Sequence, residues 1–184
     1  KDIDSAMLEA VVPWLQDLPG AAAVSERVTD IGAIPLNYLM ALVLATVTGL
    51  KHRHVIPAIL VFGCLFGAHV FQNLTNRVVQ GTVPAVDVIG AAGPYFSGGV
   101  MRVIILTGMA ATIFLPPDQD RWVWRLAVLV GIVEALTRLA LGRHWPFDLL
   151  AAFAIGLGIL HVFRTLYRPW RTPPPPPSPP PRSG

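Results

Sequence analysis

Residues 31–71 read IGAIPLNYLMALVLATVTGLKHRHVIPAILVFGCLFGAHVF, and this stretch decides the class of fold. It contains two apolar runs, Ile34–Leu50 and Val55–Phe71, which are separated by the short polar cluster Lys51–His54. A helix that crosses the ~30 Å hydrocarbon core of a membrane needs about 20 mainly apolar residues. Basic clusters at the ends of such runs are typical of the loops between membrane spans. The stretch therefore predicts two transmembrane helices joined by a tight turn.

Three further apolar runs follow, at Gly99–Leu115, Trp122–Leu136 and Leu149–Leu166. The run that starts at Trp122 is the weakest, because it carries Arg125 near one end and Glu134 near the other. Of the 184 residues, 53% are hydrophobic and only 14% are charged, whereas a soluble domain usually carries about 25% charged residues. We expect an all-α integral membrane protein with a bundle of about five transmembrane helices.

The composition excludes several other classes of protein. Cys64 is the only cysteine, so the chain is not a disulfide scaffold. The net charge is only +3, and no basic stripe is interleaved with aromatic residues, which argues against a nucleic-acid partner. His69 and His161 have no second ligand at a metal-binding spacing, so both are expected to be hydrogen-bonded polar residues of the bundle. The sequence indicates neither a metal site nor a cofactor.

The two ends of the chain differ from the middle. Residues 1–30 place apolar side chains near helical spacing with acidic and amide residues opposite, which predicts an amphipathic helix at the membrane interface. Residues 172–184 are mostly proline and predict a disordered tail. The transmembrane bundle is therefore assigned to residues 31–171. Within it, Gly63 and Gly67 have GxxxG spacing, which favours close helix packing.

Five spans would sort the loops onto two sides of a membrane. One side collects most of the basic residues: Lys51, Arg53, Arg121, Arg125, Arg164, Arg168, Arg171 and Arg182. Cytoplasmic loops are enriched in Lys and Arg, so this side and the C-terminal tail are expected to be cytoplasmic. The connections 72–98 and 137–148 would then face outward from a plasma membrane of the bacterial type.

One string of polar residues carries the clearest chemistry. Thr137 and Arg138 are followed, after five residues, by His144 and, after three more, by Asp148. An arginine can bind phosphate oxygens, a histidine can attack phosphorus, and a carboxylate can orient the imidazole. The alternative is an interfacial Arg–Asp pair beside a histidine, because charged residues at span ends are ordinary.

The string TRLALGRHWPFD, residues 137–148, resembles the third signature motif of the type 2 phosphatidic acid phosphatase superfamily, SRxxxxxHxxxD. The family's second motif, PSGH, has a partial counterpart in Phe96–Gly99, which read FSGG about 40 residues upstream. Its first motif, K-x6-R-P, corresponds in place to Gln72–Gln80. The resemblance covers roughly Pro35 to Leu166, and only the third motif is specific.

The resemblance implies a role for each matching residue. His144 would be the nucleophile that forms a phosphohistidine, and Asp148 would orient it. Arg138 would bind phosphate. Ser97 and the backbone N–H groups of Gly98 and Gly99 would hold phosphate at the start of a helix, which is a favourable anion site.

The sequence also departs from the family pattern. Gly99 stands where the family has the histidine that protonates the leaving group, and Gln72 and Val79 stand where it has the lysine and arginine of the first motif. The candidate substitutes for the missing pair of cations are Arg77, Arg102 and Arg143. Glu134 precedes Arg138 by one helical turn, so it is expected to form an i,i+4 ion pair; as a rival role it would act as a substitute acid.

Two functions follow from this pattern. The first is a phosphatase that acts on a lipid-linked phosphate or diphosphate from the outer face of the membrane. The second is a catalytically degenerate relative that serves as a subunit or scaffold of a membrane protein complex. The partners implied are a membrane lipid or lipid-linked phosphate and, in the second case, other membrane protein subunits. The retained motif residues favour the first function, and the missing cations and acid favour the second.

Overall fold

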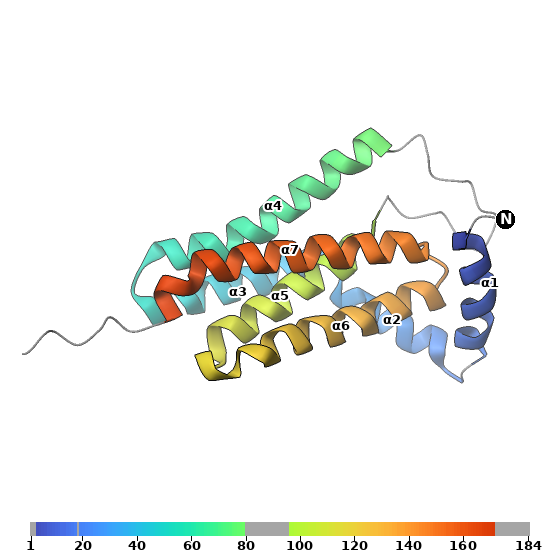
Figure 1. Cartoon of the computed structure of the whole chain (residues 1–184), viewed down its shortest axis with the longest axis horizontal. Helices are drawn as coiled ribbons and strands as arrows, with labels where there is room; N and C mark the ends of the chain where they lie inside the picture. Colours follow the sequence, from blue (N-terminus) through green and yellow to red (C-terminus); the bar gives the residue numbers. More distant parts are fainter. Residues whose placement is uncertain (1–2, 18, 80–95, 172–184) are drawn as a thin grey trace, which may run out of the picture.

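The computed structural model describes residues 3–17, 19–79 and 96–171, and within these ranges the chain is built of helices and turns (Figure 1). The proline-rich tail and most of the connection before Phe96 lie outside the described residues. The helices are α1 (Ile3–Gln16), α2 (Ala21–Ile31), α3 (Ile34–His52), α4 (Val55–Val79), α5 (Gly98–Phe114), the 3-10 turn η1 (Pro117–Gln119), α6 (Asp120–Ala140) and α7 (Pro146–Arg171).

Three of these helices, α3, α4 and α7, are long and apolar enough to cross a membrane. Helix α5 is as apolar but shorter, with 17 residues. Helix α6 does not meet the same measure of length and hydropathy, and it carries Arg125, Glu134 and Arg138. The all-helical class and the membrane character expected from the sequence are thus supported by three helices.

Helix α5 forms the centre of the bundle, packed between α6, α7, α3 and α4. Of its 17 residues, 14 are buried. Its neighbours approach closely because the contact points are glycines. A Cβ atom added at Gly108 would lie 2.2 Å from Cδ2 of Leu160, and one added at Gly131 of α6 would lie 2.6 Å from Cγ1 of Ile104. These contacts fix α5 rigidly against α6 and α7.

Helix α4 is much less enclosed. Figure 1 shows its C-terminal half leaning away from the other helices, and its exposed apolar side chains include Phe66, Phe71 and Val78, the last 85% exposed. Exposed apolar surface of this extent is what a lipid-facing helix presents. Close packing at Gly63 and Gly67 is not found: within the described residues, a Cβ atom at either position would meet nothing within 4 Å. The prediction of a packed GxxxG face is wrong for the chain by itself.

The N-terminal region forms two helices rather than the single segment expected from the sequence. Gly20, with φ of +76°, separates them, a backbone conformation that glycine adopts without steric cost. Helix α1 lies across one end of the bundle (Figure 1), and α2 packs against α6. The side chains of Ser25 and Thr29 on α2 are buried. This region therefore covers the end of the bundle at which α5 and α7 begin and α6 ends.

Candidate functional site

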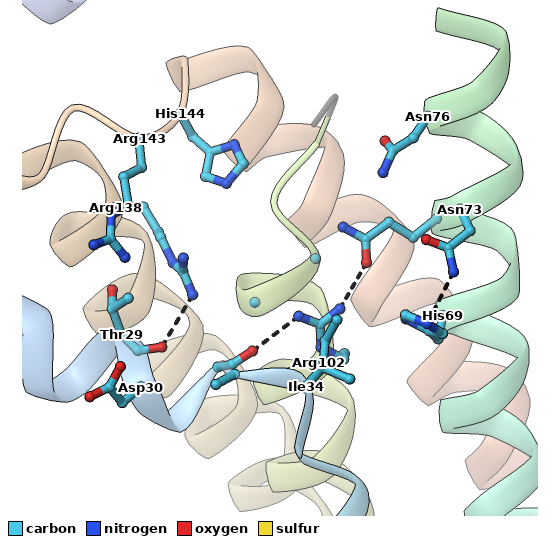
Figure 2. Close-up of a pocket in the computed structure, with 15 residues that line it drawn as sticks. Thr29, Asp30, Ile34, His69, Asn73, Asn76, Arg102, Arg138, Arg143 and His144 are labelled. Atoms are coloured by element: carbon cyan, nitrogen blue, oxygen red, sulfur yellow. Dashed lines mark hydrogen bonds between the residues drawn. The ribbon is translucent and has the colours of Figure 1, made fainter. Parts of the chain in front are cut away.

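A cavity of about 330 Å³ opens at that end of the bundle. Its walls come from α2, the start of α3, α4, the first residues of α5, and the last turn of α6 with the turn that follows it (Figure 2). The sequence-predicted residues that line it are Gly98, Gly99, Arg102, Arg138, Arg143 and His144. The structure thus brings together residues that lie up to 46 positions apart in the sequence, from two different helices and one turn.

Arg138, the predicted phosphate ligand, is held by Glu134. Its Nε and Nη2 both donate to Oε1 of Glu134, at 3.0 and 2.8 Å, and Nη2 also donates to the backbone carbonyl oxygen of Thr29 at 3.2 Å (Figure 2). The side chain of Glu134 is only 2% exposed. The i,i+4 pair expected from the sequence is therefore present, and it is buried. The carboxylate offsets part of the positive charge that Arg138 offers to the cavity.

Two glycines make room for this ion pair. A Cβ atom at Gly32 would lie 2.4 Å from Oε1 of Glu134, and one at Gly99 would lie 2.4 Å from Nη2 of Arg138. The α-carbon of Gly99 is also close to that of Gly32, since the same added Cβ at Gly32 would lie 3.1 Å from it. A side chain at position 99 would therefore collide with the guanidinium of Arg138.

Arg102 is the second cation of the cavity and is almost completely buried. Its Nη1 donates to Oε1 of Gln72 at 2.8 Å, and its Nη2 donates to the backbone carbonyl oxygen of Gly32 at 3.0 Å. Its Nε has no hydrogen-bond partner within the described part of the chain. Both hydrogen-bond partners of Arg102 are neutral, so within the described residues it forms no ion pair of the kind that Arg138 forms with Glu134.

His144 lies in the turn between α6 and α7, on the same side of the cavity as Arg138 and Arg143 (Figure 2). Its Nδ1 is 3.8 Å from Oδ2 of Asp148, which is beyond hydrogen-bonding distance. Nδ1 has no partner among the residues that the structure describes. Asp148, in the first turn of α7, instead accepts a weak bond from the backbone N–H of Trp145 at 3.4 Å. The side chains of His144 and Asp148 are adjacent, and a small movement of either would bring them within hydrogen-bonding distance.

Ser97 and Arg77 do not line the cavity. Ser97 precedes α5, and its backbone N–H donates to the carbonyl oxygen of Asp148 at 3.4 Å, so the second and third motif regions meet. Its buried hydroxyl has no partner within the described ranges. Arg77 is exposed near the end of α4. Of the three proposed substitute cations, Arg102 and Arg143 line the cavity, and Arg77 does not.

Sequence reasoning missed the walls contributed by α2 and α4. Thr29 and Asp30 come from the region assigned to the membrane interface, and His69, Asn73 and Asn76 come from α4. A signal for the α4 residues was present, because positions 69, 72, 73 and 76 follow the i, i+3, i+4, i+7 spacing of one helix face. No such signal existed for α2, whose contact with α6 is purely tertiary.

The electrostatic balance of the cavity favours an anion. Three arginines and two histidines line it, against the single carboxylate of Asp30 and the buried Glu134 beside it. The N-terminus of α5 adds backbone N–H groups that have no partner inside the helix and the positive end of the helix dipole. Within the described ranges no group of three or more His, Cys, Asp or Glu side chains is arranged to hold a metal ion.

Comparisons of the chain with family models, with curated proteins and with solved structures find no match. The resemblance to the type 2 phosphatidic acid phosphatase superfamily therefore rests on the motif residues and their spacing alone.

Proposed function

We propose that the chain is a polytopic membrane protein whose cavity binds the phosphate of a lipid-linked phosphate or diphosphate and hydrolyses it through a phosphohistidine on His144. The observation that carries this proposal is the convergence of Arg102, Arg138, Arg143 and His144 with the start of α5 on one cavity. A phosphate group is bound by such a combination of guanidinium groups and helix N–H groups.

The chemistry assigns one task to each residue. Nε2 of His144 attacks the terminal phosphorus while Asp148, which lies on the Nδ1 side of the ring, stabilises the positive charge that the imidazole gains. The bond from phosphorus to the leaving oxygen breaks, and that oxygen keeps the electron pair. Water then attacks the phosphohistidine, which restores His144 and releases inorganic phosphate. The arginines offset the charge of the phosphoryl oxygens during both steps.

The leaving group decides which substrate is favoured. A positioned acid that protonates the leaving oxygen typically contributes 10²–10⁴-fold, and Gly99 stands where the family has this acid. A diphosphate loses a phosphate oxygen that needs little protonation, whereas a monoester loses an alkoxide that needs it. We therefore propose a preference for diphosphates. Glu134 remains the rival acid, because its Oε1 would lie 3.0 Å from a Cβ atom at position 99.

The membrane arrangement that supports this function has five spans, α3 to α7. Helix α5 is enclosed by the bundle and extends for about 26 Å at 1.5 Å per residue. In α6, Glu134 and Arg138 compensate each other, which lowers the cost of placing them at the edge of the hydrocarbon core. Seven basic residues lie toward the end away from the cavity: Lys51, Arg53, Arg121, Arg125, Arg164, Arg168 and Arg171. By the positive-inside rule we propose that the cavity faces outward and the C-terminal tail faces the cytoplasm.

Hydrolysis by the purified protein in lipid nanodiscs tests the proposal. Release of inorganic phosphate is measured from a polyprenyl diphosphate and from phosphatidic acid, with the wild type and with His144→Ala. We expect faster release from the diphosphate and a loss of at least about 100-fold in the variant. His161→Ala is the matched control, because His161 is exposed on α7, stacked on Trp124, and does not line the cavity. Equal activity of His144→Ala and the wild type would exclude His144 as the nucleophile.

The second candidate function is a catalytically degenerate subunit that binds phosphate without hydrolysing it. The specific observation in its favour is that Glu134 engages two N–H groups of Arg138, while Gln72 engages Arg102. Both guanidinium groups are thus already hydrogen-bonded without substrate. Binding of a phosphate ligand with no release of phosphate from either substrate would select this candidate.

A further inference from the structure

One face of α4 carries a stripe of uncharged hydrogen-bonding side chains along the cavity. It consists of His69, Gln72, Asn73 and Asn76, which we call the amide wall; all four line the cavity. They stand out on a helix whose other exposed side chains are largely apolar. Polar side chains on a lipid-facing helix are costly, so they are retained where they face a polar space or partner. Figure 2 shows His69, Asn73 and Asn76 opposite the side formed by Arg138, Arg143 and His144.

The amide wall offers unused donors and acceptors at the same time. Nδ2 of Asn73 lies 3.0 Å from Nε2 of His69 (Figure 2), and because an amide nitrogen only donates, Nε2 of His69 accepts. A neutral His69 therefore carries its proton on Nδ1, and this buried N–H has no acceptor within the described residues. Oδ1 of Asn76 is likewise buried and has no donor there. Leaving such groups unsatisfied is costly, so a ligand that pairs with them gains affinity.

The cavity is also larger than a phosphate requires. Its 330 Å³ corresponds to roughly ten water-sized groups at ~30 Å³ each, whereas a phosphate has five heavy atoms. A phosphate bound among the arginines would leave room beside α4. A fully ionised phosphate ester accepts hydrogen bonds and has no proton to donate, so it cannot pair with the carbonyl oxygen of Asn76. A plain alkyl chain would leave both His69 and Asn76 unpaired. A hydroxyl group donates and accepts, and it carries no charge.

We propose that the amide wall recognises hydroxyl groups next to the phosphate, so that the ligand of this cavity is a phosphorylated polyol. The inference rests on the proposed phosphate site, because the arginine side must hold the phosphate for the hydroxyls to reach α4. It extends that proposal by naming the chemistry of the group that carries the phosphate.

The first test compares probes on the wild-type protein in nanodiscs, by calorimetric titration. The probes are inorganic phosphate, ethyl phosphate and glycerol 3-phosphate, of which only the last carries free hydroxyls. We expect glycerol 3-phosphate to bind roughly ten times more tightly than ethyl phosphate, as two satisfied hydrogen bonds would give. Equal affinities for these two, with inorganic phosphate still binding, would overturn the polyol inference and leave the phosphate site intact. Failure of all three to bind would overturn the proposed function itself.

The second test removes the amide of Asn76. Asn76→Leu keeps a similar volume and should weaken glycerol 3-phosphate about 5-fold while changing the affinity for inorganic phosphate less than about 2-fold. Thr75→Val is the matched control, because Thr75 is on the same helix turn, bonds its hydroxyl to the carbonyl oxygen of Phe71 and does not line the cavity. An equal loss for both ligands would assign Asn76 a structural role and count against the inference.

The source of the polyol is tested by adding lipids to the nanodiscs. Phosphatidylinositol 4-phosphate carries its phosphate on a polyol at the membrane surface, and phosphatidic acid carries its phosphate without free hydroxyls. Displacement of glycerol 3-phosphate by the first lipid but not the second supports a lipid headgroup as the ligand. Binding of glycerol 3-phosphate unaffected by either lipid supports a soluble ligand of the same class. Stronger displacement by phosphatidic acid would contradict the inference.

Discussion

The two ends of the helix bundle satisfy their polar groups in different ways. At the end where α3 meets α4, Asp120 accepts hydrogen bonds from Arg164 and Arg171, and Arg171 also donates to the carbonyl oxygen of Leu115. Nε2 of His52 there lies 2.6 Å from the hydroxyl of Tyr167. At the cavity end, buried atoms without a hydrogen-bond partner in the described residues gather in or beside one space: His69 Nδ1, Asn76 Oδ1, Ser97 Oγ, Arg102 Nε and His144 Nδ1.

The paired charges at the α3–α4 end stabilise the fold, whereas the unpaired buried atoms at the cavity end indicate a function. Charges at the first end join helices, and Arg164 Nε is the one buried side-chain atom there that lacks a partner among the residues described. Each unsatisfied buried polar group costs about 1–3 kcal/mol. A cluster of such groups around one cavity is therefore more than a folding requirement explains, and a bound polar ligand would satisfy them.

The largest effect is a loss of stability, and we expect it from Glu134→Gln. The variant leaves the guanidinium of Arg138 buried without its counter-charge, and breaking a buried pair in this way typically costs 3–5 kcal/mol. Asp120→Asn at the other end should cost under about 1 kcal/mol, because the carboxylate of Asp120 is 48% exposed and its pairs are screened by water. Thermal unfolding in detergent measures both. A larger loss of stability in Asp120→Asn than in Glu134→Gln would contradict the conclusion that the Glu134–Arg138 pair is buried and the pairs of Asp120 are screened by water.

An intermediate effect, on the affinity for inorganic phosphate, is expected from Gly99→Ala. The new methyl group would lie 2.4 Å from Nη2 of Arg138, so the guanidinium must shift away from the start of α5. We expect the affinity for inorganic phosphate to fall roughly 10-fold, which corresponds to about 1.4 kcal/mol. Gly63→Ala is the control, because no described atom would lie within 4 Å of its methyl group. Calorimetric titration of both variants decides the matter, and unchanged affinity in Gly99→Ala would remove Arg138 from the phosphate site.

The smallest effect concerns the pH dependence of stability at the closed end. Partial burial raises the pKa of Asp120, but hydrogen bonds and charges from Arg171 and Arg164 outweigh it, so the pKa lies below its ordinary value of 3.8. A carboxylate with a lowered pKa stabilises the fold above its ordinary pKa, and this contribution is lost as the pH falls through the lowered value. The difference in Tm between wild type and Asp120→Asn should therefore be constant above about pH 5 and shrink in more acidic solution. A difference that grows below pH 4 would contradict the sign.

The helices themselves could be predicted from the sequence, because charge-free runs mark them directly. The run Ile34–Leu50 corresponds to α3, Ile34–His52, and Leu149–Leu166 lies inside α7, Pro146–Arg171. The polar ends of these helices were missed, since charged side chains end an apolar run before they end a helix. The weak run at Trp122 does become a helix, but its charges keep it below the hydropathy of α3, α4 and α7.

The site could be predicted only where its residues are near in sequence. The pair Glu134–Arg138 follows from helical geometry, and His144 and Asp148 are only four positions apart; the structure places both pairs side by side. The contact of Arg138 with the carbonyl oxygen of Thr29 spans 109 positions and has no local pattern. For the same reason the exposed face of α4 at Gly63 could not be predicted. GxxxG spacing indicates how closely another helix can approach, but not whether another helix is present.

The proposed hydrolysis requires a covalent bond between phosphorus and His144. Protein in nanodiscs is incubated briefly with a diphosphate substrate carrying a radiolabelled terminal phosphate, quenched in base, and analysed for labelled protein. We predict a label that survives base and is released by acid, as expected for a phosphoramidate, that is present in the wild type and in His161→Ala, and that maps to the peptide containing His144. Hydrolysis of the substrate with no such label, or with equal labelling of His144→Ala, would contradict the phosphohistidine mechanism.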